Sequence, residues 1–258
     1  MAASESSKGE RLQVVLARHG IASRRGVVSM IEAGKVRVND VVVREKGFRV
    51  YFPKDTIAVD GQKLVSEKFD EKRYFILNKP KGVMTTLQDP HAERTVADFF
   101  RDEPLRLFPV GRLDRDTTGL LLMTNDGELA FRLTHPRYGV FKKYRVKVEG
   151  LVTDQTLERL QKGIYLEEGK TAPCRIEVGE RSQEETQLMI TIHEGKKRQI
   201  RRIFQKMGHW VTELERLEFG PISLGRLRYG EKRELNLSEV SALRQAAGLE
   251  KVRRKKPQ

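Results

Sequence analysis

The chain has 258 residues and a formal net charge of +14, with 38% apolar and 33% charged residues. This composition is too apolar for a wholly disordered chain, and the length predicts one large domain or two of unequal size. The longest aliphatic run covers only 120–123, which is too short to span a membrane, and the N-terminal residues lack the apolar stretch of a signal peptide. A single cysteine, Cys174, excludes an internal disulfide and favours a reducing, cytoplasmic compartment.

The basic excess points to an anionic partner, which could be nucleic acid, an anionic membrane surface or an acidic protein. Five Lys and Arg residues lie within the last eight residues, 251–258. We therefore expect 248–258 to form a disordered basic tail, and the small polar residues 1–9 to be disordered as well.

The N-terminal unit is predicted over 10–65, followed by a charged linker at 66–72. Leu12, Val15 and Leu16 have helical spacing, and Ser23 is suited to cap a second helix that ends at Gly34. The segments 36–38 and 41–43 predict a small hairpin sheet after the helices. Four basic residues around the second helix and first strand form either a solvated face or an RNA-binding surface: Arg24, Arg25, Lys35 and Arg37.

A larger unit is predicted over 73–247. Its hydrophobic patterns predict strands at 74–77, 119–123, 144–148, 188–192 and 211–219. They predict helices at 95–100 and 127–134, a helix that begins at residue 153, and helices at 196–207 and 238–245. Because there is no regular alternation of strand, helix and strand, we expect an α+β fold with a mixed, mainly antiparallel sheet flanked by helices.

The segment 109–126 is the strongest candidate for chemistry. A charged loop, in which Asp114 and Asp116 are flanked by Arg112 and Arg115, directly precedes the most apolar strand of the chain. Taken alone, these residues could form a salt-bridged turn, or they could hold a carboxylate ionised for use as a nucleophile or base. The five histidines lie far apart, so we expect no metal site. The sequence also lacks a phosphate-binding loop motif.

Residues 111–121 (GRLDRDTTGLL) resemble the second motif of the pseudouridine synthases that modify ribosomal RNA. Residues 78–82 (NKPKG) resemble the first motif of that family, Lys143 and Tyr144 lie on a strand at the expected place, and 194–202 (EGKKRQIRR) resemble the third motif. The N-terminal unit is similar to the S4 RNA-binding module. The combination resembles the Rsu-type branch, and most of all its large-subunit pseudouridine synthase B group.

The resemblance implies a role for individual residues. Asp114 matches the essential aspartate that attacks or deprotonates the ribose, so that uracil detaches, rotates and rejoins through carbon. Tyr144 matches the aromatic residue that stacks on the target base, and Arg201 matches the cation that pairs with the aspartate. The resemblance further implies substrate contacts by Arg112, Ile200, Lys79, Pro80 and Thr117, and we expect RNA binding near the start of the helix at 196–207 by Lys196, Lys197, Arg198 and Arg202.

The implied activity is an isomerase that uses no cofactor and no metal. Its expected partner is ribosomal RNA or a pre-ribosomal particle, not a membrane, and we expect a monomer because the sequence shows no obligate interface. Two alternatives stay open: the same chemistry on small-subunit ribosomal RNA, and a non-catalytic RNA-binding factor in ribosome assembly.

Overall fold

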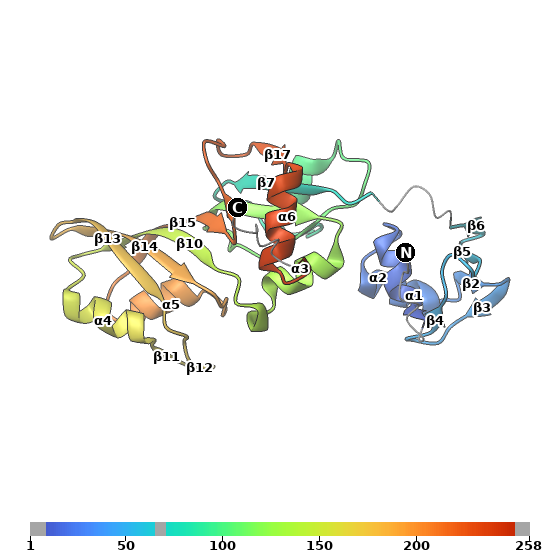
Figure 1. Ribbon diagram of the computed structural model, residues 1–258, viewed down its shortest axis with the longest axis horizontal. Helices are drawn as coiled ribbons and strands as arrows, with labels where there is room; N and C mark the ends of the chain where they lie inside the picture. The colour runs from blue at the N-terminus through green and yellow to red at the C-terminus, as the bar shows by residue number, and fades with distance from the viewer. Residues whose placement is uncertain (1–8, 65–70, 251–258) are drawn as a thin grey trace, which may run out of the picture. The chain divides into compact units, whose positions relative to one another are not determined.

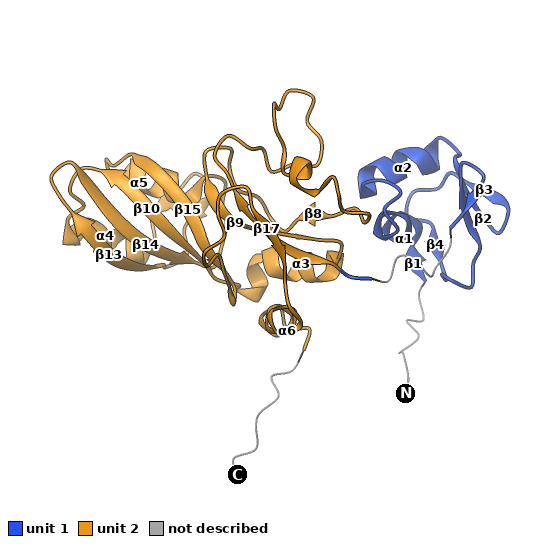
Figure 2. Ribbon diagram, turned by 90° about the horizontal axis from the view of Figure 1, so that it is seen from above, with its two compact units in different colours: residues 1–72 blue, residues 73–258 orange. Residues whose placement is uncertain are grey.

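The computed structural model describes residues 9–64 and 71–250, and the chain divides between Lys72 and Arg73 into two compact units (Figure 2). The expected N-terminal tail, most of the expected linker and most of the basic tail lie outside the described residues. Of the residues expected to be disordered, Gly9 is buried, and Leu249 packs against a hydrophobic cluster of the second unit.

The first unit places two helices against a small sheet. The helices are α1 (Leu12–Arg18) and α2 (Arg24–Glu32), and the Ser23 hydroxyl accepts a hydrogen bond from the amide of Gly26 to cap α2. The sheet has the order β3 (Val41–Val43), β2 (Val36–Val38), β5 (Ile57–Val59) and β6 (Gln62–Lys63), while β1 (Glu10–Arg11) pairs with β4 (Arg49–Val50). Leu12, Val15 and Leu16 are fully buried in its core, as their spacing predicts.

The second unit is built on a nine-stranded sheet (Figure 1). Its main path has the order β13-β14-β10-β15-β9-β7-β17, with β16 beside β15 and β8 beside β9. Among the described residues, every strand pairing in it is antiparallel except that of β15 with β9, which confirms the expected α+β class with a mixed sheet. The strands are β7 (Tyr74–Lys79), β8 (Phe108–Pro109), β9 (Thr118–Thr124), β10 (Lys142–Glu149), β13 (Arg175–Arg181), β14 (Glu185–Ile192), β15 (Val211–Phe219), β16 (Ile222–Ser223) and β17 (Lys232–Glu234); β11 (Tyr165–Leu166) and β12 (Gly169–Lys170) form a separate hairpin.

Helices cover both faces of this sheet, which explains why β9 is apolar along its whole length. Leu120 and Leu122 share one hydrophobic cluster with residues of α3 (Gly127–Thr134) and α6 (Leu237–Ala246). Leu121 and Met123 belong to a second cluster on the opposite face, which holds residues of η1 (Val96–Phe100), α4 (Asp154–Lys162) and α5 (Gln199–Lys206). A short helix, η2 (Pro136–Tyr138), follows α3.

The predicted helix at 196–207 is wrong at its start, since α5 begins only at Gln199. Arg198 adopts a left-handed backbone conformation with φ of 49°, which an α-helix of L-residues cannot continue. The side-chain oxygen of Gln199 accepts a hydrogen bond from the amide of Lys196 at 3.0 Å and closes the preceding loop. Lys196, Lys197 and Arg198 therefore belong to a loop that leads into the helix. Among the described residues, no helix combines the length and the apolar character that crossing a bilayer requires.

Candidate active site

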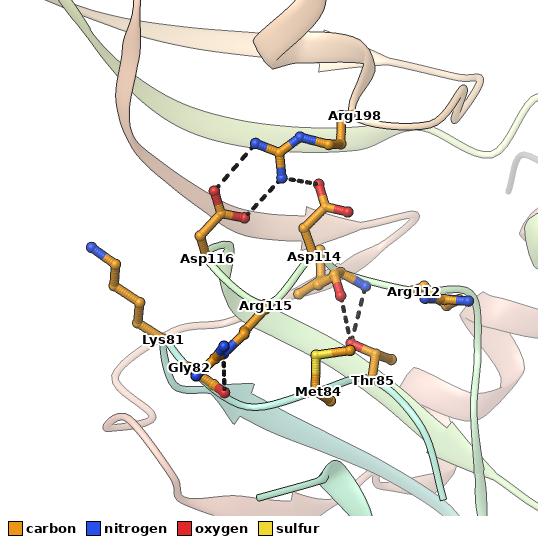
Figure 3. Close-up of a pocket in the computed structure, with 10 residues that line it drawn as sticks. Lys81, Gly82, Met84, Thr85, Arg112, Asp114, Arg115, Asp116 and Arg198 are labelled. Carbon is orange, nitrogen blue, oxygen red and sulfur yellow. Dashed lines mark hydrogen bonds and ion pairs between the residues drawn. The ribbon is translucent and has the colours of Figure 1, made fainter. Parts of the chain in front are cut away.

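The loop between β8 and β9, which carries Asp114, is fixed by hydrogen bonds from the segment after β7. The buried Thr85 hydroxyl donates to the carbonyl of Leu113 at 2.6 Å and accepts from its amide at 3.3 Å. The amide of Gly82 donates to the carbonyl of Arg115 at 2.8 Å, so contacts are made on both sides of Asp114. Figure 3 shows the Asp114 and Asp116 side chains pointing the same way from this loop.

Lys79 supports the loop from inside the protein. Its side chain is fully buried, and its ammonium donates to the carbonyls of Pro80 at 2.9 Å, Val83 at 2.8 Å and Arg115 at 3.4 Å. Burial lowers the pKa of Lys79 to about 8, while Asp116 and Asp114 act in the opposite direction. The geometry thus places Lys79 under the loop, as a residue that ties the segment after β7 to the Asp114 loop.

Two arginines of the 194–202 segment face the two carboxylates. Arg198 lies 3.2 Å from Asp116 and 3.7 Å from Asp114, and Figure 3 shows its guanidinium above both side chains. Arg201 forms its ion pair with Asp116 at 3.1 Å, whereas the resemblance had implied a pairing with Asp114. The Arg201 guanidinium also donates to the carbonyls of Val211 and Asp116. Arg201 therefore joins α5, β15 and the Asp114 loop.

The charge balance of this cluster favours the ionised form of Asp116. Partial burial acts to raise the pKa of Asp116, but the hydrogen bond from Arg198 and the charges of Arg201 and Arg198 lower it overall. Arg198 makes these contacts from a left-handed backbone that costs a residue other than glycine about 1–2 kcal/mol. Such strain is often found at functional sites, where the surrounding structure holds it in place.

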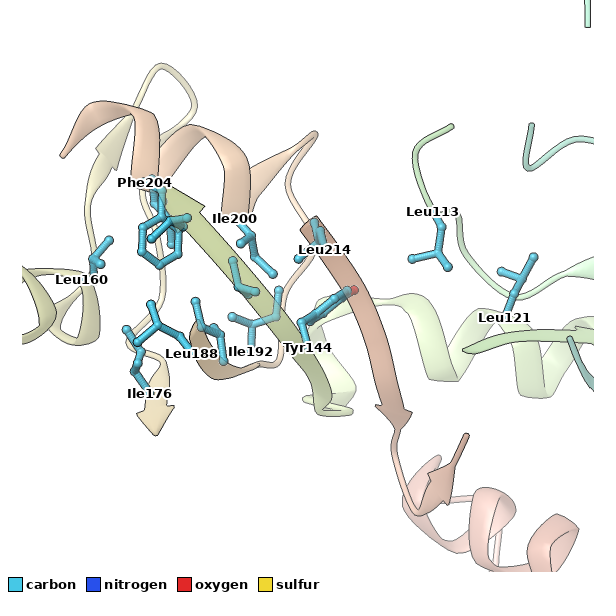
Figure 4. Close-up of a cluster of buried hydrophobic side chains, with 14 of the residues drawn as sticks. Leu113, Leu121, Tyr144, Leu160, Ile176, Leu188, Ile192, Ile200, Phe204 and Leu214 are labelled. Carbon is cyan, nitrogen blue, oxygen red and sulfur yellow. The ribbon is translucent and has the colours of Figure 1, made fainter. Parts of the chain in front are cut away.

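A cavity of about 700 Å³ opens beside Asp114. It is lined by residues that are far apart in sequence, among them Arg112, Asp114, Thr117, Tyr144, Lys197 and Ile200. Tyr144 is 8% exposed, and Figure 4 shows its side chain near Ile192 and Leu214, with Ile200 nearby. A carboxylate that is 37% exposed therefore shares one cavity with an aromatic ring set in an apolar wall.

Comparison with known proteins identifies the family. The model of a family described as RNA pseudouridylate synthase matches residues 73–206, and the S4 domain model matches residues 10–57. The chain belongs to the RNA pseudouridine synthase family. It is 45% identical over 240 residues to the ribosomal large subunit pseudouridine synthase B of Bacillus subtilis, covering 92% of this chain and 97% of that one.

Two further comparisons agree with the assignment to the pseudouridine synthases. The chain is 40% identical to the protein of the same name from Pseudomonas aeruginosa, over 95% of this chain and 64% of the relative. A crystal structure of a pseudouridylate synthase superposes with a TM-score of 0.66 at 31% identity, covering 91% of this chain and all of that one.

Several expected RNA contacts of this pseudouridine synthase are already engaged within the protein. Arg202 binds Glu168 through two hydrogen bonds of 2.8 and 2.9 Å, and the ammonium of Lys196 donates to the carbonyls of Gly169 and Lys170. In the first unit Lys35 lies 3.8 Å from Asp60, and Arg37 donates to the carbonyl of Asp40, whereas Arg24 and Arg25 are exposed at the start of α2. Pro80 lines a second cavity, together with Asp116 and Thr118.

Sequence reasoning missed two charged residues in the wall of the Asp114 cavity. Lys142 and Arg216 both line it, and both are buried. A signal for Lys142 was present, because it alternates with Tyr144, Val146 and Val148 along β10 and must point to the same face. The described residues hold no cluster of three or more His, Cys, Asp or Glu side chains placed to bind a metal ion.

Proposed function

We propose that this protein converts one specific uridine of large-subunit ribosomal RNA to pseudouridine, with Asp114 as the essential carboxylate. The observation that carries the proposal is the cavity in which Asp114 faces the space beside Tyr144 and Ile200. The large-subunit target is favoured by the similarity to the Bacillus subtilis and Pseudomonas aeruginosa proteins, which bear that substrate in their names. An RNA substrate of this kind and a single cysteine favour the cytoplasm as its compartment.

The proposed reaction rearranges bonds without a net change of atoms or electrons. Asp114 attacks or deprotonates the ribose, the bond between the ribose and N1 of uracil breaks, and the base turns within the cavity. A carbon–carbon bond then forms between the ribose and C5 of uracil; at this step the bond from Asp114 to the ribose breaks, or the proton that Asp114 removed returns to the ribose. The proton then leaves C5, and N1 gains a proton. Because the product is an isomer of the substrate, the balanced reaction requires no oxidant, reductant or group donor.

The target base must leave its stack to reach Asp114, which costs a few kcal/mol. Stacking on an aromatic side chain returns about 1–3 kcal/mol, and Tyr144 offers a ring in the wall of the cavity with Ile200 beside it. Arg198 lies beside both Asp114 and Asp116, and Arg201 pairs with Asp116, so positive charge faces the carboxylate pair. We assign Arg112, at the rim of the same cavity, to the gap left by the flipped nucleotide.

The RNA is held by further basic surfaces in this proposal. Arg24 and Arg25 at the exposed start of α2 give the S4 unit a surface for phosphates, and Lys197 adds charge beside the cavity. Arg202 and Lys196 contribute by shaping the loop before α5, since both already have protein partners.

The test is Asp114→Asn in the full chain, with Asp154→Asn as the control. Asp154 is an exposed residue of α4 that pairs with Arg181 at 2.8 Å, away from the cavity. Purified protein is incubated with transcripts of large- and small-subunit ribosomal RNA, and pseudouridine is mapped chemically at each position. We expect one modified large-subunit site with the parent chain and the control, and none with Asp114→Asn, which still binds RNA.

Activity of Asp114→Asn equal to the parent would refute the role of the carboxylate. A modified position in the small-subunit transcript alone would refute the proposed target. If the parent chain binds RNA but modifies neither transcript, the enzymatic proposal fails in favour of an RNA-binding factor.

A further inference from the structure

Two buried cations lie side by side in the wall of the Asp114 cavity. Lys142 begins β10 two residues before Tyr144, and Arg216 lies on the neighbouring strand β15; they are 9% and 3% exposed. Both approach the ring of Phe219, with the Lys142 ammonium 5.5 Å and the Arg216 guanidinium carbon 4.9 Å from its centroid. Both line the cavity that Asp114 and Tyr144 share.

Neither cation has an acidic partner among the described residues. The Nε of Arg216 donates to the carbonyl of Leu120 at 2.7 Å, but its enclosed Nη2 has no hydrogen-bond partner there. Burial, followed by repulsion from Arg216, lowers the pKa of Lys142 to about 8. Buried charges are normally paired, because an unpaired one costs free energy that nothing in the protein offsets.

The carboxylates that line the same cavity are engaged elsewhere. Asp114 lies beside Arg198, and Glu194 accepts hydrogen bonds from the Gln199 side chain at 2.6 Å and from the amide of Ala172 at 2.8 Å. Lys142 and Arg216 therefore present positive charge to the cavity without a matching acid in the described residues. A built site of this kind calls for an anion from outside the protein.

We propose that Lys142 and Arg216 form a binding subsite for a single phosphate of the RNA backbone next to the flipped nucleotide. This assignment rests on the proposed function, which brings RNA to the cavity. A phosphodiester is the anionic group that RNA offers, and a guanidinium beside an ammonium suits its oxygens. The subsite anchors the backbone on the side of the target base where Tyr144 lies, so it positions the ribose relative to Asp114.

The test is the salt dependence of RNA binding by Lys142→Met in the full chain, with a transcript of large-subunit ribosomal RNA as the probe. Each phosphate contact contributes about 0.7–0.9 to the slope of log affinity against log salt concentration. We expect Lys142→Met to reduce the slope by about one contact between about 50 and 200 mM salt. Its affinity at the lower salt concentration should fall about tenfold, as for the loss of one charge-assisted hydrogen bond.

Lys162→Met is the matched control, because Lys162 is an exposed lysine of α4 that pairs with Glu158 at 3.7 Å. The control should keep both the slope and the affinity of the parent chain. A slope for Lys142→Met equal to that of the parent would overturn the phosphate subsite.

A second measurement keeps a basic side chain at position 142 and compares the pH dependence of RNA affinity in Lys142→Arg and in the parent chain. Lys142→Arg keeps its charge at high pH, whereas Lys142, with a pKa of about 8, passes from about nine-tenths to one-tenth protonated between about pH 7 and pH 9. The other charged groups facing the cavity are Arg112, Asp114, Glu194, Lys196, Lys197, Arg198 and Arg216, Tyr144 is the further titratable group there, and both proteins share them. RNA affinity of the parent should fall about tenfold over this range, and that of Lys142→Arg much less. Equal losses in the two proteins would refute the subsite.

Pseudouridine formation is measured separately from RNA binding, so a failure of the phosphate subsite can be distinguished from a failure of the proposed function. A chain that forms pseudouridine while Lys142→Met keeps the parental slope would disprove the subsite alone. A chain that forms none, but whose slope falls in Lys142→Met, would disprove the enzymatic proposal and leave a phosphate site in an RNA-binding protein.

Discussion

Gly119 of β9 lies directly against the backbone of β15, and its replacement by alanine should separate the two strands. In the short parallel pairing of these strands, Gly119 is the partner of Arg216. A Cβ on Gly119 would press against the carbonyl oxygen of Arg216 and lie 2.7 Å from its amide nitrogen. Both neighbours are backbone atoms and cannot move aside as a flexible side chain could. The φ of Gly119 is also +99°, which disfavours any residue with a Cβ.

The expected cost has two parts. The unfavourable backbone conformation costs about 1–2 kcal/mol, and forcing a methyl group into a filled space costs about 1–3 kcal/mol. Together they give about 2–5 kcal/mol, which lowers the Tm of a domain of this size by roughly 10 °C. Because Asp114 precedes β9 and Arg216 lies on β15, we expect isomerisation to fall as well.

Differential scanning calorimetry of the full chain measures this effect, with Gly169→Ala as the control. Gly169 has a φ of +98°, but a Cβ there meets nothing within 4 Å, so this variant carries the backbone cost alone. Gly119→Ala should lower the transition of the second unit by several degrees more than Gly169→Ala, and neither should move that of the S4 unit. Equal shifts for the two variants would refute the close approach of β9 to β15.

Three further outcomes follow from the site. Tyr144→Ala should lower kcat/KM about 10- to 100-fold through lost stacking, measured as release of the C5 hydrogen of uridine. Tyr144→Phe should keep most of the parental kcat/KM, and equal losses in the two variants would assign the role to the hydroxyl. Thr85→Val should lower the free energy of unfolding in urea by about 1–3 kcal/mol and also lower kcat, because the carbonyl and amide of Leu113 both lose their hydrogen bonds to the buried hydroxyl. An unchanged kcat would show that these hydrogen bonds do not position Asp114. The pKa values of Lys79 and Lys142 are lowered from 10.5 to about 8, so above about pH 8 the folded state releases protons that the unfolded state still holds, and the free energy of unfolding rises with pH. The rise should be on the order of 1 kcal/mol per lysine between about pH 8 and 9, and Lys142→Met should remove about half of it; a rise as large in that variant as in the parent would contradict the burial of this ammonium.

Local patterns in the sequence were enough to predict most elements that position the site. The spacing of Leu12, Val15 and Leu16 predicted α1, and the alternation of Tyr144, Val146 and Val148 predicted β10, because helices and strands repeat their buried positions with fixed periods. The motif around Asp114 pointed to the family before any geometry was known. These features depend on neighbours along the chain, so they are visible in one dimension.

The pairing of charges was decided only by the tertiary structure. The sequence by itself identified Asp114, Arg198 and Arg201 as charged residues of two motifs, but it could not determine that Arg198 would reach Asp114 while Arg201 bound Asp116. That outcome depends on the left-handed backbone of Arg198, which starts α5 later than periodicity predicts. The meeting of Lys142 and Arg216 likewise depends on the register of β10 against β15. Ion pairs and buried cations depend on distances between strands and loops that are remote in sequence, and only the packed sheet sets those distances.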